Sequence, residues 1–264
     1  MTDVLTAAGV PEAGLAEVVG AYEHAVVFAT VSGAHLYGFP SDDSDIDLRG
    51  CHLLSLREVI GLRAPRETVS RMWDEDGVEM DLVTHDLAKF ARLLLKRNGY
   101  VLEQLLSPLV VHSTPAHEAM ADLAPGLVTR HHAHHYRGFA RTQWGLFEKS
   151  GELKPLLYTL RVLLTGIHLM RSGSVLAHLP SLAEQVRETP SYVGELIAAK
   201  VAAEHGALGA VPGAPDRERL AADVAALHVV LDEAQGATWL PDMPSPEGRE
   251  ALDSVVVEER LRAG

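Results

Sequence analysis

The stretch that decides the fold is residues 31–50, VSGAHLYGFPSDDSDIDLRG. It begins at the end of an apolar run over residues 25–31, whose β-branched and aromatic side chains predict a buried strand. Glycine, proline and small polar residues over 32–44 predict a loop, and a second strand is expected over 46–54. The sequence therefore predicts two strands joined by a glycine loop, with acidic residues where the second strand begins.

Two aspartates, Asp45 and Asp47, stand at the start of this second strand. Because side chains alternate along a strand, both point to one face, while Ile46 and Leu48 point to the other. Two carboxylates about 7 Å apart on one face repel each other unless a cation lies between them. Carboxylate oxygens suit Mg²⁺ or Mn²⁺, which also bridge to substrate phosphates. Asp45 and Asp47 are therefore candidate metal ligands, and capping of the preceding loop is the alternative interpretation.

A third carboxylate is expected on a neighbouring strand. The residues at 74–77 are typical of a tight turn, and they predict a β-hairpin with strands over 66–73 and 78–83. In the second of these strands Glu79 and Asp81 share a face, and the apolar residues beside them face the core. Asp81 is the candidate that would complete a site for two metal ions, and Glu79 is its rival.

The glycine loop offers a place for a triphosphate. Gly33 has no side chain to obstruct an anion, and a helical turn after it would present backbone N–H groups to a phosphate. Candidate nucleotide-binding residues are therefore Ser32, Gly33, Ala34 and His35, although His35 also suits a packed loop position. Arg49 continues the alternation of the two aspartates, so it either pairs with one of them or reaches a phosphate.

After Pro108 the strand signals fade, and helical periodicity dominates to the C-terminus. The clearest predicted helices lie over 131–149, 156–172, 191–205 and 217–235. The expected fold class is α+β, with a small mixed β-sheet domain over residues 1–112 followed by an all-helical domain over 113–264.

Charge is distributed unevenly along the 264 residues. The formal net charge of -13 disfavours a protein that coats nucleic acid with its whole surface. Residues 130–171, however, hold seven basic and two acidic side chains, which either cluster by chance or face phosphates. Lys154 and Arg161 lie nearly two turns apart on one predicted helix, so they are candidate phosphate contacts, with an ordinary helix surface as the alternative.

The remaining composition indicates a cellular compartment. Cys51 is the single cysteine, which fits a reducing cytoplasm. The first residues lack the basic start of a signal peptide, and no apolar run reaches the roughly 20 residues that a membrane span needs. A cytoplasmic protein without a membrane partner is expected.

These residues carry a family resemblance. Gly33-Ala34, Asp45-x-Asp47 and Asp81 together resemble the signature of the DNA polymerase β-like nucleotidyltransferase superfamily. The wider run from Gly33 to Gly50 is more narrowly similar to the predicted nucleotidyltransferases associated with RNA ligases in RNA repair. Segments 98–105 and 154–161 are similar to weaker motifs of the same family.

The resemblance implies a nucleotidyltransferase domain at the N-terminus, with Asp45, Asp47 and Asp81 as its catalytic metal ligands. It implies two-metal transfer of a nucleoside monophosphate from an NTP to an acceptor hydroxyl, with Mg²⁺ or Mn²⁺ as cofactor. The implied acceptor is an RNA 3′ end, and the implied partners are RNA and an RNA ligase. The sequence departs from the superfamily at Ala34, where a serine usually helps to hold the terminal phosphate.

Two alternatives to this function stay open. The acceptor hydroxyl would belong to a protein or a small molecule in the first. In the second, Ala34 weakens catalysis, and the domain is a nucleotide-binding regulatory module.

Overall fold

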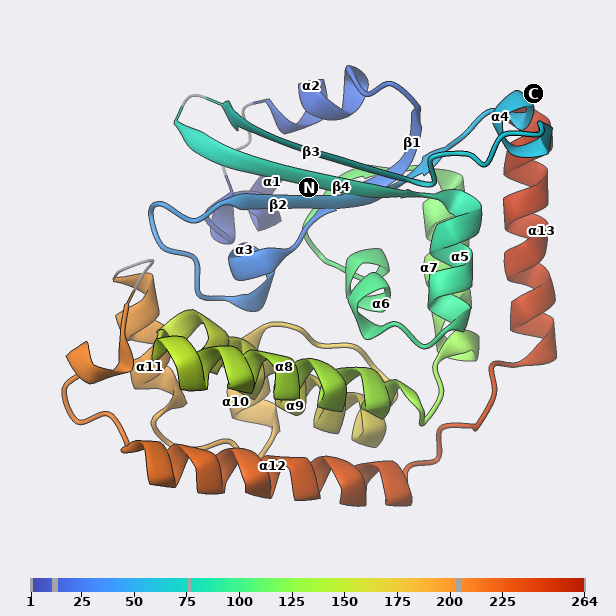
Figure 1. Ribbon diagram of the computed structural model, residues 1–264. Coiled ribbons are helices and arrows are strands. Elements are labelled where there is room, and N and C mark those ends of the chain that lie inside the picture. Colours follow the sequence, from blue (N-terminus) through green and yellow to red (C-terminus); the bar gives the residue numbers. More distant parts are fainter. Residues whose placement is uncertain (1, 11–13, 76, 203–205, 264) are drawn as a thin grey trace. The chain divides into compact units, whose positions relative to one another are not determined.

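The computed structural model describes residues 2–10, 14–75, 77–202 and 206–263. The chain forms two compact units (Figure 1). Unit 1 contains Met1–Leu36, Asp45–Val128 and Met243–Gly264, and unit 2 contains Tyr37–Ser44 and Thr129–Asp242. The two domains expected over 1–112 and 113–264 stay a prediction.

Unit 1 is built around a five-stranded sheet with the strand order β3-β4-β2-β1-β5. Strand β2 pairs parallel with β4, and the other three pairings are antiparallel. This mixed sheet, together with the helices that follow it, confirms the expected α+β class. The strands are β1 (Ala25–Val31), β2 (Ile46–Leu53), β3 (Thr68–Glu75), β4 (Val78–Asp86) and β5 (Val110–Ser113).

The four strands predicted from periodicity correspond to β1 to β4. Position 76 of the predicted hairpin turn lies outside the described residues. Strand β5 corrects the expectation that strand signals end at Pro108. This strand has only four residues, VVHS, which is too short a run for an alternating pattern to be recognised.

Helices cover both faces of the sheet in unit 1 (Figure 1). On one face the ring of Phe28 lies 5.1 Å from that of Phe90 in α5 and 4.5 Å from that of His117 in α7. On the other face, the Tyr22 hydroxyl after α2 hydrogen-bonds to Thr84 Oγ1 of β4 at 2.5 Å. The helices are α1 (Thr2–Ala7), α2 (Leu15–Gly20), α3 (Gly33–Tyr37), α4 (Leu56–Ile60), α5 (Leu87–Leu95), α6 (Gly99–Leu105), α7 (Pro115–Leu127) and α13 (Pro246–Ala263).

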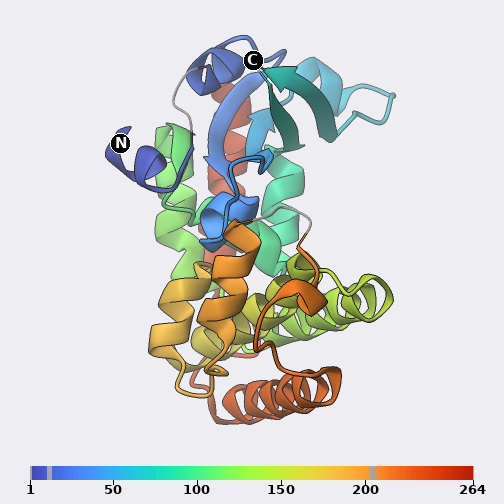
Figure 2. The same cartoon turned by 90° about the vertical axis from the view of Figure 1, so that its left-hand side faces the viewer.

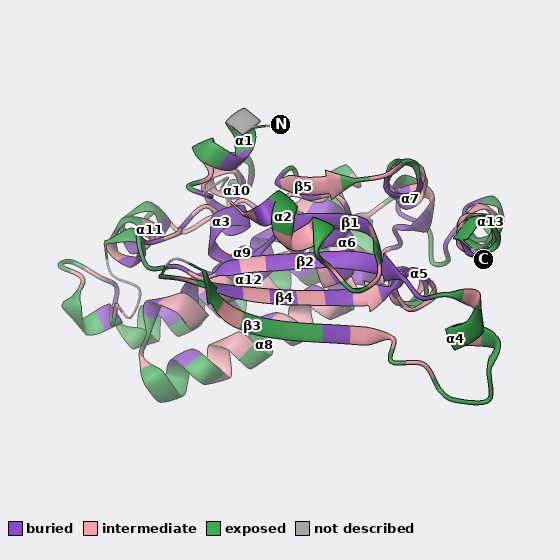
Figure 3. Cartoon of the chain, turned by 90° about the horizontal axis from the view of Figure 1, so that it is seen from above, coloured by how far each residue is buried: buried purple, intermediate pink, exposed green. Residues whose placement is uncertain are grey.

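The sheet is buried unevenly. Figure 3 shows the central strand β2 buried along nearly all of its length, whereas the edge strand β3 is mostly exposed. A strand that is covered on both faces usually has an almost continuous apolar sequence. Strand β2 is buried in this way, but its sequence also contains polar residues. Polar side chains within β2 therefore stand out as candidates for function.

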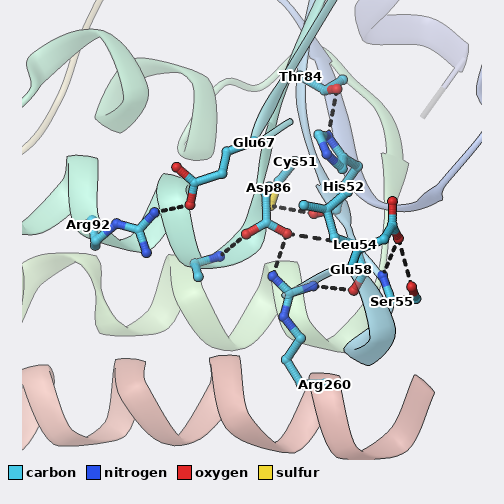
Figure 4. Close-up of polar contacts among 11 residues, drawn as sticks. Cys51, His52, Leu54, Ser55, Glu58, Glu67, Thr84, Asp86, Arg92 and Arg260 are labelled. Atoms are coloured by element: carbon cyan, nitrogen blue, oxygen red, sulfur yellow. Dashed lines mark hydrogen bonds and ion pairs between the residues drawn. The ribbon is translucent and has the colours of Figure 1, made fainter. Parts of the chain in front are cut away.

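The C-terminal helix α13 packs beside α5 and α7 of unit 1 (Figures 1 and 2). Its Arg260 donates hydrogen bonds to the Asp86 carboxylate and to the Leu54 carbonyl (Figure 4). Asp86 also caps α5 by accepting from the Ala88 N–H at 3.0 Å. Both charged side chains are buried, so each provides the counter-charge that the other needs. The last helix is thereby tied to the end of β4.

Unit 2 is helical, as expected for this part of the chain. Helix α9 is apolar on almost every side, and α8, α10, α11 and α12 all pack against it. No helix among the described residues is both long and apolar enough to cross a lipid bilayer. The elements are α8 (His132–Ser150), α9 (Leu153–Ser172), α10 (Leu179–Gln185), α11 (Val193–Val201), the 3₁₀ turn η1 (Leu208–Ala210) and α12 (Arg217–Ala237).

The four helices predicted after Pro108 correspond to α8, α9, α11 and α12. The helix expected over 191–205 is the least accurate of them, because α11 ends at Val201. Residues 203–205 of that prediction lie outside the described residues.

Candidate active site

Asp47 and Asp81 meet on one face of the sheet in unit 1. The parallel pairing of β2 with β4 places them at partner positions. Their neighbours Leu48 and Leu82 are buried on the opposite face, as the alternation of side chains requires. Both carboxylates are partly exposed, at 25% and 26% of their side-chain surface. Two like charges are therefore held side by side within reach of solvent.

Arg49 lies between these two carboxylates. Its Nη2 donates to Asp47 Oδ1 at 2.5 Å and to Asp81 Oδ2 at 2.7 Å. Its Nη1 donates to the Asp81 carbonyl at 2.5 Å, and its Nε donates to the Tyr100 hydroxyl at 2.9 Å. The sequence left open whether Arg49 pairs with an aspartate or a phosphate, and the structure pairs it with two aspartates.

The charge of Arg49 is secure in this position. Burial lowers the pKa of Arg49, but Tyr100 and the carboxylates of Asp47 and Asp81 outweigh burial and raise the pKa above its ordinary value. Arg49 therefore stays a cation and offsets the repulsion between the two aspartates.

The glycine turn touches the same site. Gly33 has a φ of 62°, and a Cβ at this position would lie 2.7 Å from Asp47 Cγ and closer still to Asp47 Oδ2. The Ser32 N–H donates to the Asp47 carbonyl at 2.8 Å, which fixes the turn against β2. Only glycine fits here, because any side chain would both strain the backbone and collide with the carboxylate. The turn is therefore packed directly against one oxygen of Asp47.

A glycine turn packed against strand-borne aspartates has a counterpart among known families. Residues 10–258 match the RNA repair pathway DNA polymerase beta family, RlaP. The chain belongs to this family. The match spans both units and confirms the resemblance to polymerase β-like nucleotidyltransferases of RNA repair.

Two curated proteins are similar in sequence to part of this chain. The protein is 34% identical to "Uncharacterized protein MJ0002" of Methanocaldococcus jannaschii over 153 residues, which is 56% of this chain and 61% of the relative. It is 26% identical to "Uncharacterized protein YcgL" of Bacillus subtilis over 156 residues, which is 57% of this chain and 58% of the relative. The matched regions thus span about three fifths of these curated relatives.

In this RlaP protein, the residues around Gly33 are deeply buried. Ser32 is fully buried, and its hydroxyl has no hydrogen-bond partner among the described residues. The antiparallel register of β1 with β2, which pairs Val31 with Leu48, continues to place Ser32 beside Asp47. Ala34 is buried as well. A buried hydroxyl without a partner is costly unless something binds there, so Ser32 marks this position as a candidate ligand contact.

His35 packs inside unit 1. Its ring is buried, and Nδ1 is hydrogen-bonded to the Ala8 carbonyl at 2.9 Å. The surroundings of His35 therefore correspond to the alternative interpretation, that of a packed residue. Its assignment to the nucleotide stays a prediction.

Asp45 is placed differently from the other two aspartates. It lies one residue before β2, so the pairing with β4, which starts at Ile46, does not hold it. Within the described residues, no three His, Cys, Asp or Glu side chains are grouped so that they could hold a metal ion. The structure therefore brings Asp47 and Asp81 together without grouping Asp45 with them. The donor chemistry still fits a hard cation such as Mg²⁺, because two carboxylates lie at partner positions on β2 and β4.

Lys154 and Arg161 lie on α9 in unit 2. Lys154 is half-buried near the start of the helix. Arg161 is only 1% exposed, and its guanidinium lies 3.7 Å from the centre of the Tyr37 ring. The roles of Lys154 and Arg161 in nucleotide binding stay predictions, and the surface position considered for Arg161 is wrong.

Sequence reasoning missed one residue of the site, Tyr100. This tyrosine follows Asn98, whose side chain caps α6 by accepting from the Tyr100 N–H at 3.0 Å. The cap turns Tyr100 so that its hydroxyl receives the Arg49 Nε hydrogen bond. The sequence allows Asn98 to be recognised as a helix cap. The partner of Tyr100, however, is Arg49, which lies 51 residues earlier, so no local pattern connects these two residues.

Proposed function

We propose that this RlaP protein transfers a nucleoside monophosphate from an NTP to the 3′ hydroxyl of an RNA. The observation that supports it best is the pairing of Asp47 with Asp81 beside the glycine turn at Gly33. Membership of a nucleotidyltransferase superfamily gives the reaction class, and the RNA repair pathway in the family description supports RNA as acceptor. An RNA ligase that seals repaired ends is the partner class we propose.

Asp45, Asp47 and Asp81 are the residues that would hold Mg²⁺ or Mn²⁺. When bound, two such ions would supply charge neutralisation at the attacking and leaving oxygens. In the proposed reaction, the RNA hydroxyl gives its proton to Asp81 while its oxygen bonds to the α-phosphorus. The bond from that phosphorus to the bridging oxygen breaks, and pyrophosphate leaves with the electron pair.

On the nucleotide side, we assign the triphosphate to the turn formed by Ser32, Gly33 and Ala34. The superfamily serine is replaced by Ala34, and the unpartnered hydroxyl of Ser32 supports the view that Ser32 takes over its contact. Arg49 is engaged with both carboxylates, so its proposed role is to orient Asp47 and Asp81 rather than to grip a phosphate.

The test uses purified full-length protein, Mg²⁺ and each α-labelled NTP, with RNA oligonucleotides that end in a 3′ hydroxyl or in a 3′ deoxy sugar. The expected result is label on the hydroxyl-ended RNA alone. Asp47→Asn is expected to lose the labelling, whereas Asp43→Asn, an exposed loop aspartate two residues before Asp45, is the matched control that retains it. Label on protein or on a small molecule would reject RNA as the acceptor. Saturable NTP binding without any transfer would reject the enzyme in favour of the regulatory module.

A further inference from the structure

An exposed apolar side chain lies beside the two aspartates in unit 1. Met72 of the edge strand β3 is the ladder partner of Asp81, which in turn is the partner of Asp47. Partners in a ladder point to the same face of the sheet, and neighbouring strands are about 5 Å apart. The three side chains therefore form one row across β2, β4 and β3. Met72 is 64% exposed at the outer end of this row, so its apolar surface is open to a substrate.

We propose that unit 1 holds the acceptor RNA along β3, with the base of its 3′-terminal nucleotide on Met72 and its backbone phosphates on Lys89 and Lys96 of α5. This assignment rests on the proposed function, in which Asp81 receives the proton of an RNA hydroxyl. It adds the residues that bind the acceptor strand and the direction in which that strand runs.

The side chain of Met72 suits a nucleobase. A thioether is polarisable, and its sulfur packs favourably against aromatic rings. Every base offers an aromatic face, so a contact of this kind depends on the presence of a base rather than on its identity. The neighbouring position of Asp81 in the same row places such a base beside the carboxylate that acts on the terminal hydroxyl.

Charge sets the direction of the strand, because the two ends of β3 differ in sign. At the hairpin end, Asp74 and Glu79 are ladder partners and both are exposed. At the other end, about 13 Å from Met72 along β3, Lys89 donates a hydrogen bond to Thr68 Oγ1. An ammonium has three donors, so two of them remain without a partner among the described residues. A polyanionic backbone is therefore repelled at the hairpin and attracted toward the start of β3.

Helix α5 extends this positive charge. Residues 87–97 contain four basic and no acidic residues, in a chain with a formal net charge of -13. Lys89 and the exposed Lys96 lie about two turns apart, so they share one face of the helix. Arg92 on the same face is paired with Glu67, just before β3 (Figure 4). In the described part of the chain, no salt bridge engages either lysine, so both charges are available to phosphates.

The positive charge continues from α5 toward the catalytic row. His85 lies on the same face of β4 as Asp81, and its Nδ1 is 2.9 Å from Thr68 Oγ1. Burial lowers the pKa of His85, and the charges of Lys89 and Arg49 lower it further. One ring is thus within the electrostatic reach of both the α5 lysine and the arginine that bridges the aspartates.

The experiment measures the affinity of the full chain for a single-stranded RNA with a 3′ hydroxyl, by fluorescence anisotropy without NTP and over a range of salt concentrations. Lys89→Gln and Lys96→Gln should each weaken binding about threefold. Each should also reduce the slope of log K against log salt by about 0.7, the value for one phosphate contact with a single strand. A change that only perturbed the fold would not move this slope by a fixed step.

Arg71→Gln is the matched control for charge. Arg71 is exposed and directly precedes Met72 in β3, but its ladder partner is the buried Leu82 on the opposite face of the sheet. Its loss should leave RNA affinity within about twofold of wild type. Unchanged thermal unfolding establishes that each variant is folded.

A second measurement tests the base contact separately. Met72→Ala should weaken RNA binding about threefold and leave the salt slope unchanged, because no charge is removed. The same variant should bind an RNA that lacks its 3′-terminal base as tightly as the wild type does, because that contact is already absent. Equal losses on the two RNAs would overturn the role of Met72.

The remaining outcomes concern the path of the backbone. Wild-type affinity and salt slope in a folded double variant of Lys89→Gln and Lys96→Gln would overturn the path, and transfer to RNA could still proceed. Displacement of the RNA by an acidic peptide of equal charge as readily as by unlabelled RNA would instead assign these lysines to an acidic protein partner. A wild-type chain that binds no RNA would remove the RNA acceptor of the proposed function itself.

Discussion

Asp47 and Asp81 occupy partner positions on the parallel strands β2 and β4, and their carboxylates share one nitrogen of Arg49. Each carboxylate gives one oxygen to this bridge, and Oδ2 of Asp47 faces the turn at Gly33. Two like charges at neighbouring positions destabilise a sheet unless a cation offsets them. Arg49 provides that cation in the folded chain, and the predictions below test what the pair of carboxylates does.

The first prediction tests whether Asp81 or Glu79 is the third carboxylate of the site. Asp81→Asn should lower nucleotidyl transfer by about 100-fold or more, because it removes a charged oxygen donor beside Asp47. Glu79→Gln should change the rate by less than about threefold, because Glu79 is exposed and no hydrogen bond joins it to Arg49 in the described part of the chain. Initial rates with saturating NTP and RNA check both variants. The reverse order of effects would reassign the role to Glu79.

The second prediction concerns the residues that orient the carboxylates. Arg49→Lys should lower the rate about 10- to 100-fold, because an ammonium cannot reproduce the planar set of donors that bridges Asp47 and Asp81. Tyr100→Phe keeps the ring and removes only the acceptor of Arg49 Nε, so a smaller loss of up to about 10-fold is expected. Rates over a range of Mg²⁺ concentrations should show both losses mainly as weaker metal binding. Loss of NTP affinity at saturating Mg²⁺ would instead favour a phosphate contact for Arg49.

The third prediction tests the orphaned hydroxyl. Ser32→Ala should raise the KM for NTP about 10-fold, because it removes a hydrogen-bond donor from the proposed triphosphate turn. It should not lower the free energy of unfolding, because the hydroxyl makes no hydrogen bond to any described residue that the change would remove. Adding Ala34→Ser should recover part of the NTP affinity. Wild-type KM in Ser32→Ala would show that the hydroxyl does not reach the nucleotide.

The fourth prediction is a pH dependence of stability that arises from His52. Burial, reinforced by the nearby His24, lowers the pKa of His52 to about 4. In the unfolded chain the pKa is about 6.5, so between these values the unfolded state binds the proton more readily. Stability from this group is full above pH 6.5 and falls by roughly 1 kcal/mol per pH unit as the pH drops toward 4.

His52→Gln should remove this contribution, and urea unfolding at several pH values between 4.5 and 7 measures it. His135 in unit 2 has a pKa lowered to about 4 by burial as well, so part of the pH dependence should remain. An unaltered pH dependence in His52→Gln would contradict the assignment.

The fifth prediction concerns the C-terminal helix. Arg260→Met should destabilise the protein by about 3–5 kcal/mol, because it leaves the Asp86 carboxylate buried without its counter-charge. Arg262→Met, two residues further on, removes an exposed ion pair and should cost less than about 1 kcal/mol. Denaturant unfolding of the two variants gives the comparison. Equal stability of both would show that α13 is not held through Arg260.

Local pattern was enough to predict where Asp47 and Asp81 lie on their strands. The alternation of Ile46 and Asp47 follows from strand geometry, and the turn signal at 74–77 placed Asp81 on a following strand. The strand alternation expected for Asp45 does not apply, because β2 begins at Ile46. The glycine at position 33 carried its own conformational signal, and the structure gives it a positive φ. These features depend on residues within a few positions of one another, which is the range over which backbone geometry and side-chain size act.

Other features depended on contacts between distant parts of the chain. The sequence did not predict β5, the return of α13 to unit 1, or the bond from Arg49 to Tyr100. From the sequence, Arg161 is expected to be either a phosphate contact or a surface residue, whereas the structure places it over the Tyr37 ring. A helical pattern shows which residues share a face but not what that face contacts.

Sequence by itself therefore determined the class of fold and the family to which the chain belongs, and it supplied the prediction of which residues carry the chemistry. Tertiary structure alone decided that β2 lies parallel to β4 in the register that pairs Asp47 with Asp81, and that residues 37–44 pack with the helical unit. The physical reason is that strand register and helix packing are selected by the burial of side chains far apart in the chain, whereas periodicity records only which side of each element is apolar.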